Sequence, residues 1–285
     1  MTANRYDLTE KVVLITGGCG GIGAATGREL LRRGARLVVA DIDPRTPDRS
    51  AALGADRVLG CVADVRDRSC LDEVVAQAVA RFGRIDIVMA NAGLLARAAT
   101  LRNTPTADVA ATLAVNVLGV VNTVAAGMDQ VIDNRGQIVL ISSVFAFING
   151  MGTIPYAMSK AAVEQLGRGL RIELADHDVS VLTAYFSLVD TEMIQHGVDQ
   201  DDVVTELLSN LPKPMLKRVS PVAAATVLAD GLERRSARVI HPAVWRPVSA
   251  LRGLLGPSLD ARFAADRRIL DVLARLDARR PIPHP

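Results

Sequence analysis

Lysine, histidine and aromatic side chains are scarce in this chain, and so is net charge. Aromatic residues make up 3% of the sequence, and the formal net charge is +2 over 285 residues. So small a net charge argues against a nucleic-acid partner held by charge. The lysines are Lys11, Lys160, Lys213 and Lys217.

Cysteines are few and carry no metal-binding pattern. Cys19, Cys61 and Cys70 are odd in number and lack the spacing of metal ligands. We therefore expect reduced thiols and no metal site.

Long apolar runs are missing as well. No uninterrupted run reaches the roughly 18 to 20 residues that a membrane span needs, and residues 1–10 are polar with no apolar signal segment. These absences predict a cytoplasmic protein without a membrane span. The length of 285 residues fits one large domain that buries its own core without disulfides.

The sequence does contain a regular alternation of short β-branched runs with longer helical patterns. It predicts strands at 11–16, 36–41, 57–62, 85–90, 136–142, 179–185 and 238–240. It predicts helices at 21–33, 68–82, 106–131, 156–176 and 220–234. Strands that are apolar almost throughout are typical of a parallel sheet buried on both faces. We therefore predict an α/β fold: a single-domain, Rossmann-type, doubly wound parallel sheet of about seven strands.

Two stretches interrupt the alternation. Residues 190–219 are polar, contain Pro212 and Pro214, and follow the sixth predicted strand. Because ligands bind beyond the carboxyl ends of strands in open α/β sheets, this stretch is a candidate substrate lid. The catalytic domain is expected to span 1–241, and a helical C-terminal extension of the same domain is expected over 242–285.

A glycine-rich loop follows the first predicted strand and opens the first predicted helix. It reads Thr16-Gly17-Gly18-Cys19-Gly20-Gly21-Ile22-Gly23. Glycines permit a tight turn and a close backbone approach to a pyrophosphate, which then lies at the N-terminus of a helix. The loop therefore predicts a dinucleotide-binding site.

An acidic residue ends the second predicted strand, 18 residues after Gly23. The carboxylate of Asp41, followed by Ile42, is placed to accept hydrogen bonds from the adenosine ribose hydroxyls. It would repel the additional phosphate of NADP, and no arginine lies between Gly17 and Gly23 to offset that repulsion. We therefore expect NAD as the cofactor.

A tyrosine and a lysine lie four residues apart in the predicted helix at 156–176. Tyr156 and Lys160 are on one helix face, and Ser143 ends the fifth predicted strand thirteen residues before the tyrosine. A neighbouring ammonium and a positive nicotinamide would lower the pKa of the Tyr156 phenol from about 10. Tyr156 would then exchange a proton with an alcohol or carbonyl oxygen that the Ser143 hydroxyl holds.

With these motifs, residues 8–241 resemble the classical short-chain dehydrogenase/reductase family. The resemblance implies that Ser143, Tyr156 and Lys160 carry the chemistry, that Asn116 completes their proton relay, and that Lys160 also binds the nicotinamide ribose. It further implies that Asp64-Val65 bind adenine and that Asn91-Ala92-Gly93 follow the fourth strand, with Asn91 mainly structural. Family members are commonly homodimers or homotetramers built through the helices that correspond to 106–131 and 156–176.

The sequence departs from the family after the sixth strand. Phe186-Ser187 stand where the family has Pro-Gly, while Val189 and Thr191 keep the pattern that meets the nicotinamide carboxamide. Loss of the glycine removes free access to positive φ, and loss of the proline frees the turn. Cofactor placement there is thus open.

The segments around the predicted site are apolar and lack basic side chains. They comprise Val144, Phe145, Ala146, Phe147, Ile148, Leu188, Met193 and Ile194. A pocket of this kind fits a hydrophobic secondary alcohol or ketone, although the same residues can simply pack the core. The predicted function is NAD-dependent hydride transfer with such a substrate. The alternatives are an NADP-linked ketoreductase of the same family and a catalytically weak NAD-binding regulator.

The extension after the last predicted strand carries an amphipathic pattern. Its apolar stripe consists of Leu259, Phe263, Ile269, Leu273 and Leu276, widened by Leu270 and Val272. Such a helix needs an apolar surface to cover. The candidates are its own domain, a neighbouring subunit and a lipid surface, and acidic residues among its arginines weaken the lipid alternative. We expect an ordered helix held by protein contacts.

Overall fold

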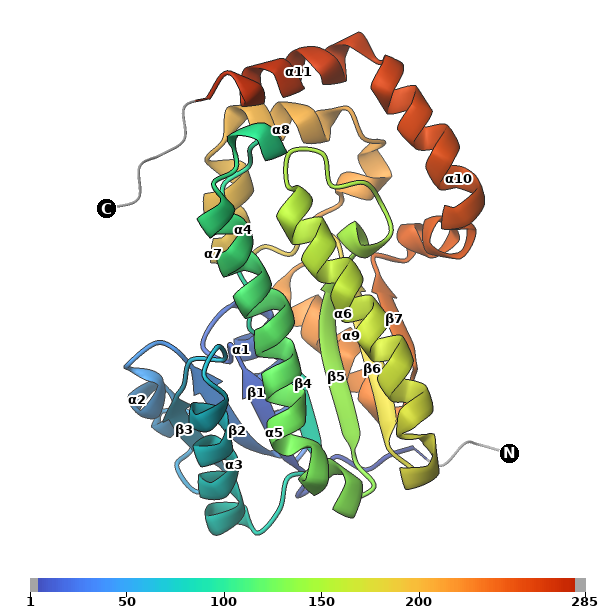
Figure 1. Cartoon of the computed structure of the whole chain (residues 1–285). Helices are drawn as coiled ribbons and strands as arrows, with labels where there is room; N and C mark the ends of the chain where they lie inside the picture. The colour runs from blue at the N-terminus through green and yellow to red at the C-terminus, as the bar shows by residue number, and fades with distance from the viewer. Residues whose placement is uncertain (1–4, 280–285) are drawn as a thin grey trace.

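Seven parallel strands form one sheet in the computed structural model, which describes residues 5–279. The strand order is β3-β2-β1-β4-β5-β6-β7 (Figure 1). The strands are β1 (Val12–Thr16), β2 (Arg36–Asp41), β3 (Val58–Val62), β4 (Ile87–Ala90), β5 (Gln137–Ser143), β6 (Ser180–Phe186) and β7 (Arg238–His241). The predicted α/β fold is confirmed, and no strand end differs from its prediction by more than two residues.

The helices between the strands also lie where the sequence predicts them. They are α1 (Gly21–Arg32), α3 (Arg68–Phe82), α4 (Thr106–Leu113), α5 (Gly119–Asp133), α6 (Ile154–Glu173) and α9 (Pro221–Glu233). Local signals set their ends: Asp67 caps α3 through the backbone N–H of Ser69, and Gly83 ends it with a φ of +79°. Ser220 caps α9, and Pro221 occupies its first position.

Helices cover both faces of the sheet, and each face has its own core. On one face Leu71 of α3, Val124 of α5 and Val163 of α6 pack on the strands, in front of the sheet in Figure 1. On the other, Leu30 of α1 and Leu228 of α9 pack behind it. Burial on both faces explains why the strands are apolar almost throughout.

The predicted helix at 106–131 is three consecutive pieces. A π-helical turn, Ala114–Leu118, joins α4 to α5. By length and composition the run Thr106–Asp133 is apolar enough to cross a membrane. Val120 and Val131 of this run pack in the core against the sheet. One such helix does not by itself indicate a membrane span.

Segments outside the alternation gather beyond the carboxyl ends of the strands. The stretch 190–219, predicted as a polar lid, contains the helices α7 (Glu192–Ile194) and α8 (Asp202–Ser209). The short helix α2 (Thr46–Ala51), which the sequence did not predict, follows β2.

The C-terminal extension is two helices rather than one amphipathic helix. In α10 (Arg246–Ala265) and α11 (Arg267–Asp277) the chain arches over the sheet and ends on α8 (Figure 1). The single helix predicted across 259–276 is wrong because Asp266 leaves helical geometry and caps α11 through the Arg268 N–H. Ile269, Val272 and Leu276 are buried, whereas Leu270 is exposed and does not belong to the apolar stripe.

Candidate active site

The glycine loop forms the turn between β1 and α1. Gly17 has a φ of +63°, which favours glycine. A Cβ on Gly23 would lie 2.3 Å from the Gly17 carbonyl oxygen, so the first turn of α1 packs directly on the loop. The amide of Asn91, just after β4, donates to the carbonyl oxygens of Thr16 (3.0 Å) and Gly17 (2.9 Å). Asn91 thus braces the loop from behind.

A cleft of about 550 Å³ opens in front of this loop, and we call it the glycine-loop cleft. Of the residues predicted for the site, it is lined by Gly17, Gly20, Gly21, Ile22, Asp41, Ile42, Asp64, Val65, Asn91, Ala92, Gly93, Ser143, Tyr156, Lys160, Val189 and Thr191. Four predicted residues lie behind its wall: Thr16, Cys19, Gly23 and Asn116. Residues distant in sequence thus meet at the carboxyl ends of the strands.

Asp41 is held at the end of β2 by two backbone N–H groups. Its carboxylate accepts from the N–H of Cys19 (2.9 Å) and from that of Asp43 (3.1 Å). Two nearby cations, Arg45 and Arg49, both pair with Asp43 rather than with Asp41. The charge of Asp41 at the cleft therefore has no arginine partner in residues 5–279.

Asp64, on the next strand end, is paired with a cation. Three contacts of 2.5 to 3.0 Å join its carboxylate to the Arg66 guanidinium. The hydrogen bonds from the Arg66 guanidinium lower the pKa of Asp64, and they outweigh partial burial, which alone would raise it. Arg66 itself lines the cleft, so this wall presents an ion pair.

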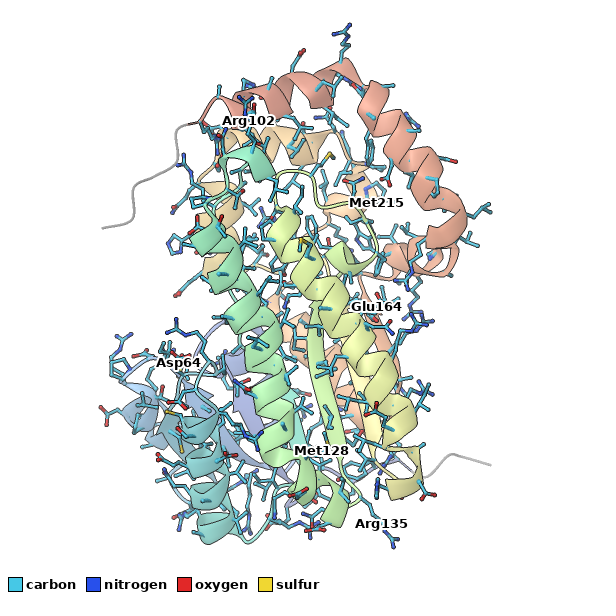
Figure 2. All side chains as sticks on the ribbon, in the orientation of Figure 1. Asp64, Arg102, Met128, Arg135, Glu164 and Met215 are labelled. Carbon is cyan, nitrogen blue, oxygen red and sulfur yellow. The ribbon has the colours of Figure 1, made fainter. Side chains whose placement is uncertain are left out.

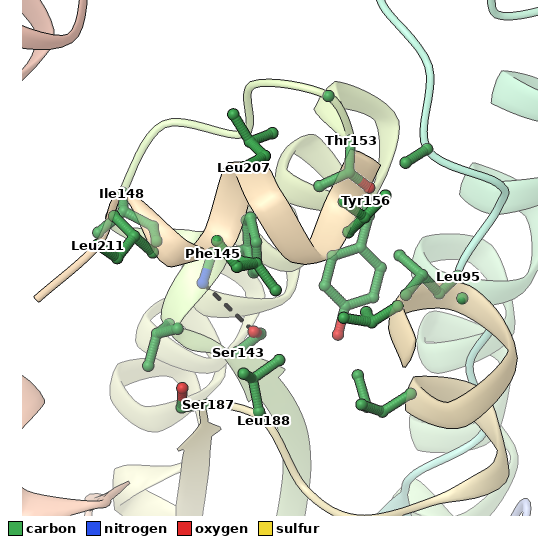
Figure 3. A pocket seen from close by; sticks show the side chains of 18 of the residues that line it. Leu95, Ser143, Phe145, Ile148, Thr153, Tyr156, Ser187, Leu188, Leu207 and Leu211 are labelled. Atoms are coloured by element: carbon green, nitrogen blue, oxygen red, sulfur yellow. Dashed lines mark hydrogen bonds between the residues drawn. The ribbon is translucent and has the colours of Figure 1, made fainter. Parts of the chain in front are cut away.

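Tyr156, Lys160 and Ser143 come together where α6 crosses the end of β5. The ammonium of Lys160 lies 5.5 Å from the centroid of the Tyr156 ring and donates to the Ile141 carbonyl oxygen at 3.0 Å. The Ser143 hydroxyl donates to the Phe186 carbonyl oxygen at 3.2 Å and accepts from the Phe145 N–H. Figure 3 shows the Tyr156 phenol pointing into the pocket, with Ser143 to its left.

Asn116 lies in the π-helical turn and is fully buried. Its side-chain oxygen accepts from the Leu94 N–H (2.8 Å), and its amide donates to the Leu94 carbonyl oxygen (2.9 Å) and to the Ser159 hydroxyl (3.1 Å). Asn116 therefore links Leu94, in the irregular segment after β4, to Ser159 of α6, the residue before Lys160.

Burial controls the protonation of the site. It raises the pKa of Tyr156 to about 12, against the opposing effect of the Ser143 hydroxyl. It also lowers the pKa of Lys160 to about 8. The lowered pKa predicted for Tyr156 depends on a bound, positively charged nicotinamide as well as on Lys160; in the protein by itself, loss of hydration moves the pKa of the phenol upward.

Phe186-Ser187 fit the turn after β6 without strain. Phe186 stays in the strand, opposite His241 of β7. Neither residue has a positive φ, so the glycine usual in the family is not needed here. The Ser187 hydroxyl donates to the Met215 carbonyl oxygen at 3.3 Å and so attaches the turn to the lid.

A second, apolar pocket of about 100 Å³ lies on the far side of Tyr156, and we call it the inner cavity. Of the residues predicted for a hydrophobic pocket, Val144, Phe145, Ile148, Leu188 and Ile194 line it, and no charged side chain does. Figure 3 shows Leu95 at one side and Ile148 with Leu211 at the other. Ala146, Phe147 and Met193 do not line this cavity.

Several lining residues escaped the sequence analysis. Leu95, Met215 and Trp245 line the inner cavity, and Arg66 and Glu192 line the glycine-loop cleft. Arg66 and Glu192 adjoin predicted residues, which is a usable signal. The other three come from loops whose placement depends on the tertiary fold, and the sequence holds no local signal for them.

Comparison with known proteins gives consistent matches. The short chain dehydrogenase family model matches residues 11–202. A (2S)-[(R)-hydroxy(phenyl)methyl]succinyl-CoA dehydrogenase subunit of Thauera aromatica is 35% identical over 78% of this chain and 90% of its own length. The 2-(R)-hydroxypropyl-CoM dehydrogenase of Xanthobacter autotrophicus is 28% identical over 78% and 91%, respectively. The levodione reductase structure superposes with a TM-score of 0.74 at 25% identity, covering 81% of this chain and 95% of that one.

Proposed function

Because the chain belongs to the short-chain dehydrogenase family and is thus an oxidoreductase acting on CH–OH groups, we propose that it transfers hydride between NAD and a hydrophobic secondary alcohol or ketone. Tyr156 is the general acid and base of this reaction. In this proposal the catalytic domain spans 1–241, with 190–219 as the lid, and 242–285 form the extension; residues 1–4 and 280–285 lie outside the described residues.

One observation carries the proposal: Tyr156 stands at the boundary between two cavities. Tyr156, Ser143 and Ser187 line both the glycine-loop cleft and the inner cavity. A substrate carbon in the inner cavity would therefore be next to a nicotinamide in the cleft and next to the phenol. Hydride transfer requires this meeting of cofactor, substrate and proton donor.

The cleft fits a dinucleotide with a free ribose. Its volume of about 550 Å³ is in the range of ligand sites, and the loop places the N-terminus of α1 at its floor. Asp41 would accept from the adenosine ribose hydroxyls, Val65 and Ile42 would flank the adenine, and Val189 and Thr191 would meet the carboxamide. When bound, NAD supplies the hydride acceptor, or as NADH the donor.

The chain's own groups handle the proton. Tyr156 takes the proton of the alcohol as its C–H bond breaks, and it returns a proton to the oxygen in the reverse reaction. Ser143 orients that oxygen. Lys160 uses one of its three N–H donors on Ile141, so the others are available to a cofactor ribose and the phenolate. Asn116 holds the segment after β4 in position against α6 for this relay.

The substrate class follows from the lining of the inner cavity. The lining is apolar apart from a few hydroxyl groups, among them Ser143, Thr153 and Ser187. With no cation to bind a carboxylate or phosphate at the reacting end, we infer an uncharged, hydrophobic group around the alcohol or ketone.

The decisive experiment removes the proton donor alone. Tyr156→Phe keeps the ring and its packing, and we expect turnover of a substrate found by screening to fall by about a thousandfold or more. NADH affinity, measured by fluorescence titration, should change less than about threefold. Near-native turnover of Tyr156→Phe would reject the mechanism. Tight NADH binding with no turnover of any alcohol by the native protein would favour the regulator.

We also propose a homo-oligomer. Three apolar side chains are exposed on neighbouring elements. Leu118 (59% exposed) lies in the π-helical turn, Val121 (39% exposed) in α5 and Met158 (50% exposed) in α6. Exposed apolar side chains on these two neighbouring helices would be covered by a second copy of the chain.

A further inference from the structure

A third cavity lies beneath the C-terminal arch. This outer cavity, of about 570 Å³, is enclosed between α10, the 145–151 segment and the lid. Leu255, Leu259 and Phe263 contribute from the arch, and Phe147 and Pro212 from the opposite sides. It is several times larger than the inner cavity.

The outer and inner cavities share a wall of apolar side chains. Phe145, Ile148, Leu211, Met215 and Trp245 are among the residues that line both. Figure 3 shows Ile148 and Leu211 on the side of the inner cavity away from Leu95. Methionine adapts its shape readily, so this wall can open to a ligand that crosses it without movement of the backbone.

The arch is fixed firmly enough to form a binding surface. Asp277 of α11 accepts from the Thr100 hydroxyl at 2.6 Å and pairs with Arg102 at 3.0 Å. Figure 2 shows the position of Arg102. Arg279 forms two contacts of 2.5 Å with Asp201 at the start of α8. Farther back, Arg252 of α10 pairs with Glu164 of α6 at 2.7 Å.

The polar groups around the outer cavity are largely paired within the protein. Arg252 is bound to Glu164, Arg268 to Asp266, and Asp260 to the amide of Asn149. Among residues 5–279, Asp260 and the exposed Arg262 are the charged lining residues without an ion pair, and Asp260 accepts the hydrogen bond from Asn149. The surface offered to a ligand is therefore mainly apolar.

From this geometry we infer that the outer cavity holds the apolar body of an elongated substrate whose alcohol or ketone lies at Tyr156 in the inner cavity. The inference rests on the proposed function and narrows it. An inner cavity of about 100 Å³ is smaller than the cavity of about 150 Å³ that takes up one benzene ring. A substrate with about six or more carbon atoms must therefore extend under the arch, so the arch selects for length.

A series of 2-alkanols from 2-butanol to 2-decanol tests this. We expect kcat/KM of the native enzyme with NAD to rise about threefold for each added methylene beyond 2-hexanol. Leu255→Trp adds bulk to one wall of the outer cavity and should reduce that rise while leaving 2-butanol within about twofold of native. Leu254→Trp is the matched control, because Leu254 is adjacent in α10 but 75% exposed, and it should keep the native profile. A native profile that is flat beyond 2-hexanol, or identical profiles for the two variants, would overturn the inference and leave the proposed function intact.

Binding can be measured without turnover. Trp245 is the only tryptophan of the chain and lines both cavities, and a ketone does not react with the oxidised cofactor. Intrinsic fluorescence of the native protein with NAD⁺ should give a Kd for 2-decanone at least tenfold below that for 2-butanone. Tight 2-decanone binding without oxidation of any alcohol would reject the proposed function and would leave the outer cavity as a binding site for the apolar body of a ligand. Equal Kd values would overturn the inference.

Discussion

At the scale of single residues, Lys160 brings a positive charge into a buried position. Burial lowers its pKa to about 8 from the ordinary 10.5. Below pH 8 the ammonium is charged in both states and the folded state carries its desolvation cost. Between about pH 8 and 10.5 the unfolded chain binds the additional proton, so this residue makes the free energy of unfolding rise with pH.

Lys160→Met should therefore stabilise the protein without cofactor. The difference of about 2.5 pKa units corresponds to at most about 3 kcal/mol at pH 7, and the gain should shrink as the pH passes from 8 to 10. Chemical denaturation at pH 7 and pH 9.5 measures this, and NADH affinity of the same variant should fall. If Lys160→Met is less stable than native at pH 7, then the hydrogen bond to Ile141 outweighs the desolvation.

Asp41 supports a second prediction, on cofactor choice. Asp41→Asn keeps the shape of the side chain and removes its charge, so the ratio of NADP(H) to NAD(H) affinity should rise at least tenfold. Isothermal titration with both cofactors measures this ratio. Asp48→Asn, on the exposed side of α2, is the control. If the native protein binds NADP(H) at least as tightly as NAD(H), the result would instead support the NADP-linked ketoreductase.

The residues of the site differ in how far the sequence reveals them. Tyr156, Lys160 and Ser143 could be predicted because helix spacing and a strand end fix their relative positions. The direction of the Tyr156 pKa shift could not, since it depends on how much water the folded chain removes from the phenol. Trp245 and Leu95 reach the inner cavity from distant loops, and no local pattern marks them.

At the scale of elements, α11 is held by a narrow apolar face. Leu276 is fully buried against Leu207 and the 151–152 turn, whereas Leu270 of the same helix is 39% exposed. Leu276→Ala should lower the free energy of unfolding by about 3 kcal/mol, and Leu270→Ala should change it by less than about 0.5 kcal/mol. Urea denaturation followed by circular dichroism compares them. Equal effects would show that α11 does not dock as described.

The extension also shows where sequence periodicity fails. The spacing from Leu259 to Leu276 continues past Asp266 as if one helix were present, yet the chain turns there and α11 leaves in a new direction. The spacing of apolar residues predicts which face of a helix is buried. It does not predict the angle between two consecutive helices whose apolar residues follow the same spacing. The sheet was predictable because each strand is buried on both faces and is therefore a short run of almost entirely apolar residues.

At the scale of the whole molecule, the proposed homo-oligomer depends on the exposed face of α5. Val121→Glu places a charge on that face and should shift the mass measured by light scattering from oligomer to a smaller species. Val222→Glu, on α9 behind the sheet and 68% exposed, should leave the mass unchanged. A native protein that is monomeric at micromolar concentration would contradict the proposed assembly.

The contacts of Asp277 also bear on the order in which parts of the protein are synthesised and packed. Asp277 bonds to Asn103, 174 residues earlier in the chain, while all seven strands and the residues around Tyr156 lie before residue 242. On the ribosome, the catalytic frame therefore leaves the exit tunnel first, and the cover over its apolar cavities is synthesised last. Until α10 and α11 have emerged and docked, the nascent chain exposes apolar surface that the finished protein covers.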